Sequence, residues 1–182
     1  MIRVAILTVS DSCSQGKRED ISGQTIEDML GSRLAGSLPE DRFEICRKKI
    51  VADEHEKIVN ELKYFSAQAD IDVVFTTGGT GLGPRDVTPE ATASVCDRII
   101  PGLGEMMRAE GLKKTKNAVL SRGIAGICNR TLVINLPGSP KGVKESLEII
   151  LDVLPHAVDM MRGGGHGWRE EYSRTEQTYN EQ

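Results

Sequence analysis

Several signals that would set a function class are missing from this 182-residue sequence. The four cysteines stand singly, without the C-x-x-C spacing of a zinc knuckle, which predicts reduced thiols rather than a disulfide framework. No run of Lys or Arg is long enough for a nucleic-acid arm, and 23 basic against 27 acidic residues give a net charge of -4. Binding of duplex nucleic acid is therefore not expected as the main task.

Long apolar stretches are missing as well. No segment approaches the roughly 18 apolar residues of a membrane-spanning helix, and MIRVAILTVS lacks the cationic start and apolar core of an export signal. We therefore expect a soluble protein of the cytoplasm, without a membrane or nucleic-acid partner. No Ser-His-Asp or Cys-His set of a nucleophilic hydrolase is indicated by the pattern either.

Short β-branched runs alternate with amphipathic helical patterns along the chain. The runs lie at 2–9, 43–51, 71–77 and 131–136. Apolar residues at helical spacing recur in two sets, namely Ile58, Leu62 and Phe65, and Val143, Leu147, Ile150 and Leu154. The alternation predicts an α/β three-layer sandwich with a mostly parallel sheet. GIAGICN, before the last run, could add an antiparallel hairpin at one edge, with a turn at Asn129-Arg130.

The periodic patterns end near residue 162. The last twenty residues, GGGHGWREEYSRTEQTYNEQ, are polar, led by glycine and without periodicity, which is typical of a flexible tail. A chain of this length fits one domain plus such a tail. We therefore predict one domain over residues 1–162 and a C-terminal tail over residues 163–182.

A glycine-rich loop follows the third predicted strand, in the stretch TTGGTGLGPRDVTPEA (76–91). Open α/β sheets bind ligands beyond the carboxyl ends of their strands. Glycines at positive φ can turn several N–H groups toward one anion. Thr88 is expected to cap the next helix, with Pro89 in its first turn. The loop predicts a phosphate site, and a glycine turn without a ligand is the structural alternative.

Two common phosphate loops do not match this stretch. GGTGLGPR (78–85) has the glycine separation of the Walker loop, but Pro84 and Arg85 stand where that loop has lysine and a hydroxyl. The same Pro84 occupies the third glycine position of the dinucleotide fingerprint. The sequence supports neither a P-loop nor hydride transfer.

A second unit of strand, loop and helix lies in TLVINLPGSPKG (131–142). It places Gly138, Ser139 and Lys141 near a helix N-terminus, although Pro-Gly-Ser-Pro is also an ordinary turn and cap. Two such loops on one sheet could hold different parts of a large anionic ligand, or two ligands that meet end to end.

Two carboxylates beside these loops indicate a metal. Asp86 follows the glycine loop and Asp53 follows the second strand, and either could hold a hydrated Mg²⁺ that bridges phosphates. Each has a structural alternative. DEHE (53–56) is a capping-box pattern with Asp53 as N-cap, and Asp86 could pair with Arg85 or with a backbone turn.

Other polar candidates have the same ambiguity. Ser10, Asp11 and Ser12 end the first strand, where they could contact a ligand or form a polar turn. Ser121 and Arg122 could meet an anionic substrate, although such a pair more often lies on the surface.

These motifs together resemble the molybdopterin adenylyltransferases, the family that includes the G domain of gephyrin. The resemblance rests on TTGGTGLGPRDVTPEAT, with LTVSDSCSQG and VADE before it and PGLGEMMR, AVLSRGIAG and LVINLPGSPKGVKE after it. It covers residues 2–162 in order. The GGTG and PRDVTPEAT string is specific to the molybdenum-cofactor superfamily, and NLPGSPKGVKE is similar to the adenylyltransferase branch.

The resemblance implies a reaction and a set of site residues. ATP and molybdopterin, with Mg²⁺, would give adenylylated molybdopterin and pyrophosphate. Asp53 and Asp86 would be the catalytic pair and the metal ligands. The implied nucleotide-binding residues are Gly78, Gly79, Thr80, Gly81, Gly138 and Ser139. The implied pterin-binding residues are Ser10, Asp11, Ser121 and Asn135.

The resemblance also implies partners and leaves alternatives. Family members are typically homotrimers that pass their product to a molybdate-inserting enzyme. The same superfamily contains pterin-binding proteins of uncertain catalytic competence, so a catalytically idle carrier or scaffold is one alternative. A hydrolase of pyrophosphate bonds of the competence-damage type is the other.

Overall fold

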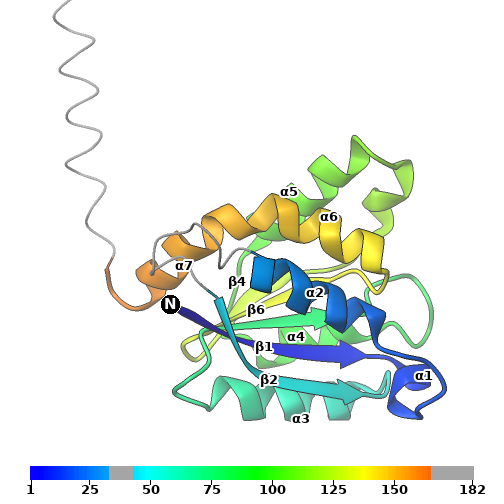
Figure 1. The fold of residues 1–182 in the computed structure, drawn as a ribbon, viewed down its shortest axis with the longest axis horizontal. Coiled ribbons are helices and arrows are strands. Elements are labelled where there is room, and N and C mark those ends of the chain that lie inside the picture. The colour runs from blue at the N-terminus through cyan, green and yellow to red at the C-terminus, as the bar shows by residue number, and fades with distance from the viewer. Residues whose placement is uncertain (33–42, 165–182) are drawn as a thin grey trace, which may run out of the picture.

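The computed structural model of the chain describes residues 1–32 and 43–164, and its strands and helices alternate as predicted (Figure 1). In chain order the elements are β1 (Ile2–Val9), α1 (Asp11–Ser14), α2 (Ile21–Ser32), β2 (Phe43–Val51), α3 (His55–Ser66), β3 (Val73–Thr77), α4 (Thr88–Val95), β4 (Arg98–Ile99), α5 (Pro101–Leu112), the 3-10 helix η2 (Lys116–Leu120), β5 (Ala125–Cys128), β6 (Thr131–Leu136), α6 (Pro140–Ile150), the 3-10 helix η3 (Leu151–Val153) and α7 (Leu154–Met161). Most of the predicted C-terminal tail lies outside the described residues.

The described strands form one sheet of six strands in the order β2-β1-β3-β6-β5-β4. The pairs β1 with β2, β1 with β3, and β3 with β6 are parallel. The predicted antiparallel hairpin is present as β5 and β6, joined at Asn129, whose φ of 54° suits a tight turn. The sequence did not indicate β4, which pairs with β5 through only two residues.

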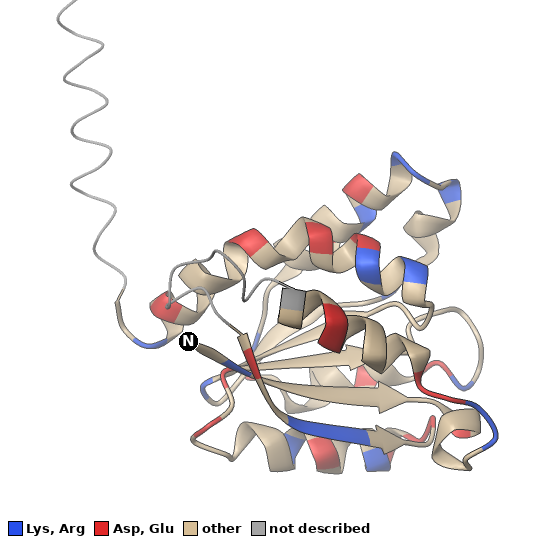
Figure 2. Cartoon of the chain, viewed as in Figure 1, with Lys and Arg blue, Asp and Glu red and all other residues tan. Residues whose placement is uncertain are grey.

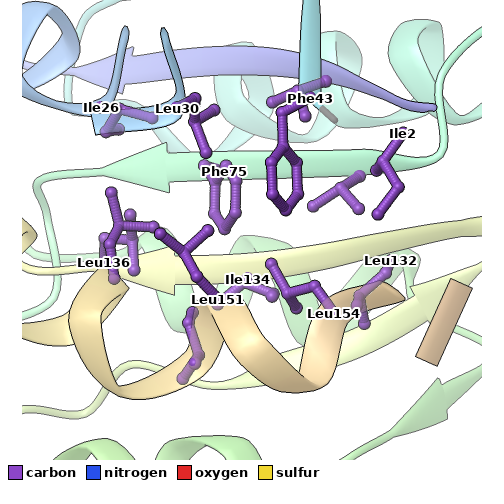
Figure 3. Close-up of a cluster of buried hydrophobic side chains, with 14 of the residues drawn as sticks. Ile2, Ile26, Leu30, Phe43, Phe75, Leu132, Ile134, Leu136, Leu151 and Leu154 are labelled. Carbon is purple, nitrogen blue, oxygen red and sulfur yellow. The ribbon is translucent and has the colours of Figure 1, made fainter. Parts of the chain in front are cut away.

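Helices cover both faces of the sheet, so the three-layer prediction is confirmed. Figure 1 shows α2, α5, α6 and α7 on one face and α3 and α4 on the other. Along β1 the side chains alternate between two buried clusters, with Val4 and Ile6 in one and Ala5 and Leu7 in the other. Figure 3 shows the larger cluster, in which Phe75 of β3 packs among aliphatic side chains from the sheet and from the helices that cover one of its faces.

Both predicted apolar helix faces are buried. Ile58, Leu62 and Phe65 of α3 pack against the sheet. The second face, from Val143 to Leu154, is buried too, but it spans two helices and the short η3 between them. Pro155 explains the interruption, because proline lacks an N–H group and clashes with the preceding turn of a helix.

Two capping predictions are wrong. Thr88 is the first residue of α4 rather than its N-cap, and its hydroxyl donates to the Gly78 carbonyl at 2.9 Å. Asp53 does not cap α3, because Glu54 occupies the N-cap position and makes no side-chain cap bond. In both cases the side chain that the local pattern assigns to a cap is hydrogen-bonded to another segment instead. Thr88 donates to the Gly78 carbonyl, and Asp53 accepts from the Asp11 N–H.

The edge strand β2 carries exposed cations. Figure 2 shows basic residues along this strand, where Arg47, Lys48 and Lys49 follow one another. Charged side chains on an edge strand oppose pairing with another sheet. Among the helices of the described residues, none has the length and apolarity needed to cross a bilayer.

Candidate active site

The candidate site lies at the carboxyl ends of the parallel strands. β1 lies between β2 and β3, so the connections from β1 to β2 and from β2 to β3 run in opposite directions across the sheet. Open α/β sheets bind ligands at such a switch point. Four predicted site residues follow four strand ends, namely Ser10, Asp53, Gly78 and Gly138. All four border one cavity of about 200 Å³.

The glycine loop after β3 has a backbone that only glycine adopts easily. Gly78 and Gly79 have φ values of 97° and 62°. A Cβ on Gly78 would lie 2.2 Å from the Val9 carbonyl oxygen, and a Cβ on Gly79 would lie 2.3 Å from Thr88 Oγ1. The loop is therefore both left-handed and closely packed from two sides.

The carbonyl groups of this loop are engaged by the protein, whereas several of its N–H groups are not. Gly78 and Gly79 accept hydrogen bonds from the Thr88 hydroxyl and the Thr88 N–H, at 2.9 and 3.1 Å. Within residues 1–32 and 43–164, the N–H groups of Gly79, Thr80 and Gly81 donate to no protein acceptor. Free N–H groups on a turning backbone are the donors that an anion requires.

The second predicted loop runs beside the first. Thr77 Oγ1 donates to the Pro137 carbonyl at 2.7 Å, and a Cβ on Gly138 would lie 3.1 Å from Gly78 Cα. Ser22 of α2 fixes the same loop by donating to the Gly138 carbonyl at 2.7 Å. The structure therefore brings the two segments predicted to bind nucleotide into direct contact.

Asp53 and Asp11 hold each other across the ends of β1 and β2. The Asp11 N–H donates to Asp53 Oδ2 at 2.6 Å, and the Asp53 N–H donates to Asp11 Oδ1 at 3.1 Å. Arg85 then binds both oxygens of Asp11. The hydrogen bonds from Arg85 lower the pKa of Asp11, whereas burial is the main cause of the raised pKa of Asp53.

Asp86 lies against the same glycine loop that Asp53 faces, with its Oδ2 2.9 Å from the position of a Cβ on Gly81. Its Oδ2 accepts from the Gly83 N–H at 2.7 Å, so the expected contact with a backbone turn is present, whereas Arg85 pairs with Asp11 instead of Asp86. Arg122 stabilises this loop by donating to the carbonyls of Gly81 and Asp86, and it forms an ion pair with Glu90. Arg122 thus belongs to the loop framework, a role that no local spacing indicated.

A second cavity, of about 220 Å³, opens between α5, η2 and α6. Ser121, Asn135 and Ser139 border it, together with Arg108, which donates to the Gly123 carbonyl at 3.0 Å. The four residues predicted to bind the pterin therefore separate. Ser121 and Asn135 border this second cavity, whereas Ser10 and Asp11 border hollows near Asp53 and Arg85.

Asn135 is buried and hydrogen-bonded to the protein through both its amide nitrogen and its amide oxygen. Its Nδ2 donates to the hydroxyls of Thr76 and Thr92, both at 2.9 Å, and its Oδ1 accepts from the Ile124 N–H at 3.3 Å. The side chain therefore forms part of the cavity wall and joins β6 to β3 and α4.

Sequence reasoning missed several residues of this region. Thr8 donates to Asp20 Oδ2 at 2.6 Å, and both residues border the first cavity. Arg108 lies in the quoted string PGLGEMMR, but a single arginine within a helix carries no spacing that marks it as a site residue. Only the tertiary fold brings these side chains to the strand ends.

Comparison with known proteins agrees with this geometry. A family model described as a probable molybdopterin binding domain matches residues 5–156. The chain belongs to this family. The match runs from β1 to the start of α7 and includes both loops, Asp53 and Asp86.

Individual relatives of this family cover most of the chain. The chain is 44% identical to the molybdopterin adenylyltransferase of Helicobacter pylori (strain J99) over 162 residues, which is 89% of each protein. It is 38% identical to that of Escherichia coli K12 over 151 residues, covering 83% of this chain and 74% of the relative. The crystal structure of the molybdopterin biosynthesis enzyme MoaB from Thermus thermophilus superimposes with a TM-score of 0.80 at 48% identity, over 90% of this chain and 98% of that chain.

Proposed function

We propose that the protein is a molybdopterin adenylyltransferase, which transfers AMP from ATP to molybdopterin and releases pyrophosphate. One observation carries the proposal, namely two loops in contact at the sheet switch point, beside Asp53 and between two cavities, where three N–H groups of the first loop donate to no acceptor among the described residues. The names of relatives at 38% and 44% identity support the same reaction.

The nucleotide is assigned to the paired loops. The N–H groups of Gly79, Thr80 and Gly81 would bind phosphate oxygens, and Gly78 provides the turn that aims them. Gly138 and Ser139 would add the positive end of α6, which begins at Pro140. Backbone donors suit a triphosphate because they need no cationic side chain, which accounts for the missing Walker lysine.

Asp53 and Asp86 are assigned as the catalytic pair and the Mg²⁺ ligands. No group of three or more potential metal-binding side chains occurs in the described part of the chain. A pair of carboxylates is nevertheless enough for Mg²⁺, which commonly takes one or two carboxylates and completes its shell with water and substrate phosphates. Within the same residues, Asp53 Oδ1 accepts no hydrogen bond and is available as a ligand. Bound Mg²⁺ would reduce the electrostatic repulsion between the two phosphate groups as they approach each other.

The pterin is assigned to the second cavity, with Ser121 as a polar contact and Asn135 in the wall. Ser10 remains a candidate contact from the first cavity. The loop of residues 137–139 separates the two cavities, since Ser139 borders one and Gly138 the other. A pterin in the second cavity would therefore present its terminal phosphate to the α-phosphorus of a nucleotide held by the paired loops.

The chemistry asked of the protein is alignment and charge stabilisation. The terminal phosphate of molybdopterin attacks the α-phosphorus of ATP, a new phosphoanhydride bond forms, and the bond to the pyrophosphate leaving group breaks. Two anions must be held within reacting distance, which the fixed loop donors would do without reorganising.

The wider setting is also a proposal. A homotrimer is part of this proposal, and the exposed apolar side chains of Leu112, Val119 and Leu120 are candidates for its subunit contacts. A molybdate-inserting enzyme would be the downstream partner. Free thiols at all four cysteines fit the cytoplasm as the location.

Pyrophosphate release tests the function. The protein is mixed with ATP, Mg²⁺ and molybdopterin, and release is expected only when all are present. Binding of molybdopterin without release would favour an idle pterin-binding protein. Nucleotide hydrolysis without molybdopterin would favour a hydrolase.

A further inference from the structure

Asp11 and Arg85 form a forked ion pair at the edge of the candidate site. Arg85 Nε donates to Asp11 Oδ2 at 3.1 Å, and Arg85 Nη2 lies 2.8 Å from Oδ1 and 2.9 Å from Oδ2. The Arg85 and Asp11 side chains are 58% and 40% exposed. Exposed ion pairs contribute little to folding stability, so stability alone does not explain a pair of this geometry.

The pair is continuous with Asp53. Asp11 Oδ1 also accepts from the Asp53 N–H at 3.1 Å, and the Asp11 N–H donates to Asp53 Oδ2 at 2.6 Å. Asp53 Oδ2 is therefore fixed by the backbone of α1. The other oxygen, Asp53 Oδ1, lies 3.4 Å from the position of a Cβ on Gly79, so it faces the glycine loop.

Three segments meet in this arrangement. Asp11 follows β1, Asp53 follows β2, and Arg85 belongs to the loop that follows β3. The Arg85 guanidinium donates to Asp11 from two nitrogens, Nε and Nη2, and so fixes the orientation of the carboxylate. A lysine would supply only a single point charge. The orientation of Asp53 thus depends on a side chain that lies far along the chain, on the loop that would hold the nucleotide.

We propose that Asp11 and Arg85 are positioning residues, which fix Asp53 so that Oδ1 faces the nucleotide loop. The inference rests on the proposed adenylyl transfer and deepens it. It replaces the expected contact of Asp11 with the pterin, because both carboxylate oxygens of Asp11 are already occupied by Arg85 and Asp53.

The kinetic test uses Arg85→Met, Arg85→Lys and Asp11→Asn. Misplacing a reacting group by about 1 Å can cost about 100-fold in rate, so kcat is expected to fall about 10- to 100-fold in Arg85→Met. KM for ATP and for molybdopterin should change less than about twofold. Arg85→Lys should recover part of kcat. A rise in KM for either substrate with unchanged kcat would overturn the proposal, because it would make these residues ligand contacts.

The double variant Asp11→Asn/Arg85→Met tests whether the two residues act as one unit. Its kcat is expected to equal the lower of the two kcat values measured for Arg85→Met and Asp11→Asn, because either change alone removes the forked ion pair. Multiplied losses would show two independent roles and would contradict the proposal. Arg47→Met is the matched control, because Arg47 is an exposed arginine of β2 that pairs with Asp70 at 3.7 Å, and its loss should leave kcat and KM unchanged.

A measurement without substrates separates this inference from the proposed function. Amide hydrogen exchange at Asp11 and Asp53, followed by NMR, reports the two reciprocal bonds directly. Arg85→Met should accelerate exchange at both amides with the urea unfolding midpoint unchanged, and Arg47→Met should not. Unchanged exchange at both amides would overturn the positioning role even if the wild type transfers AMP. A wild type without transfer would defeat the proposed function and leave this test in force.

Discussion

Asp86 combines a negative charge with a purely local structural contact, which makes it the sharpest single position for testing the chemistry. Its one side-chain hydrogen bond among the described residues comes from the Gly83 N–H. An asparagine at this position keeps the size and an oxygen acceptor for that bond but removes the charge.

Asp86→Asn is therefore expected to leave the fold and molybdopterin binding near normal and to lower kcat by at least about 100-fold, as when one electrostatic contact to a transition state is lost. Turnover and molybdopterin affinity are measured on the same preparation. Asp70→Asn is the control, since Asp70 is a partly exposed aspartate outside both cavities. Normal turnover in Asp86→Asn would remove Asp86 from the mechanism.

Gly79 is one of the two glycines at positive φ on which the proposed phosphate loop depends. A Cβ there would meet Thr88 Oγ1 at 2.3 Å in a backbone with φ of 62°. Gly79→Ala is expected to lower the free energy of unfolding by about 1–3 kcal/mol and to weaken ATP binding. Urea unfolding and ATP titration check the two effects.

Gly102→Ala is the comparison for this change. Gly102 lies in the first turn of α5, and a Cβ there meets nothing within 4 Å. It should leave ATP binding unchanged and raise the free energy of unfolding by up to about 1 kcal/mol. If both variants behave alike, the special backbone at Gly79 has no role in binding.

At the scale of elements, Asp72 joins three parts of the fold. It stands just before β3, accepts from the Arg3 N–H of β1 at 2.8 Å, and pairs with Arg162 after α7 at 2.8 Å. Burial alone would raise the pKa of Asp72, but these hydrogen bonds and the two guanidinium groups lower it on balance. The ionised carboxylate therefore stabilises the folded state.

The sign of the pH effect follows from the lowered pKa. The stabilisation is present above the unfolded pKa of about 3.9 and is lost as pH falls through the folded value. Asp72→Asn is expected to lower the free energy of unfolding by about 1–3 kcal/mol at pH 7, with a smaller difference from the wild type near pH 3. Equal differences at both pH values in urea unfolding would contradict this account.

Elements with strong local signals were predictable from the sequence. β1 and β6 match the β-branched runs because both faces of these strands are buried and the whole run must be apolar. The caps were not predictable. The capping pattern at Asp53 is chemically sound, but the Asp11 N–H, 42 positions away in the chain, takes the carboxylate instead.

At the scale of the whole molecule, the candidate site is assembled from four strand ends that are far apart in sequence. Their common location follows from parallel strands, so the sequence could predict that the two loops and Asp53 meet. It could not predict the separation of Ser10 from Ser121, because that depends on how α5, η2 and α6 enclose the second cavity. Family membership over residues 5–156 ties this arrangement to molybdopterin.

The central claim is that the protein joins AMP to molybdopterin, and it is tested most directly by following the α-phosphate. ATP labelled at the α-phosphate is incubated with the protein, Mg²⁺ and molybdopterin in a single turnover, and the products are separated. The account predicts that the label appears in adenylylated molybdopterin, one for each pyrophosphate released, and that no label moves without molybdopterin. Label found only as free AMP, at a rate independent of molybdopterin, would contradict it.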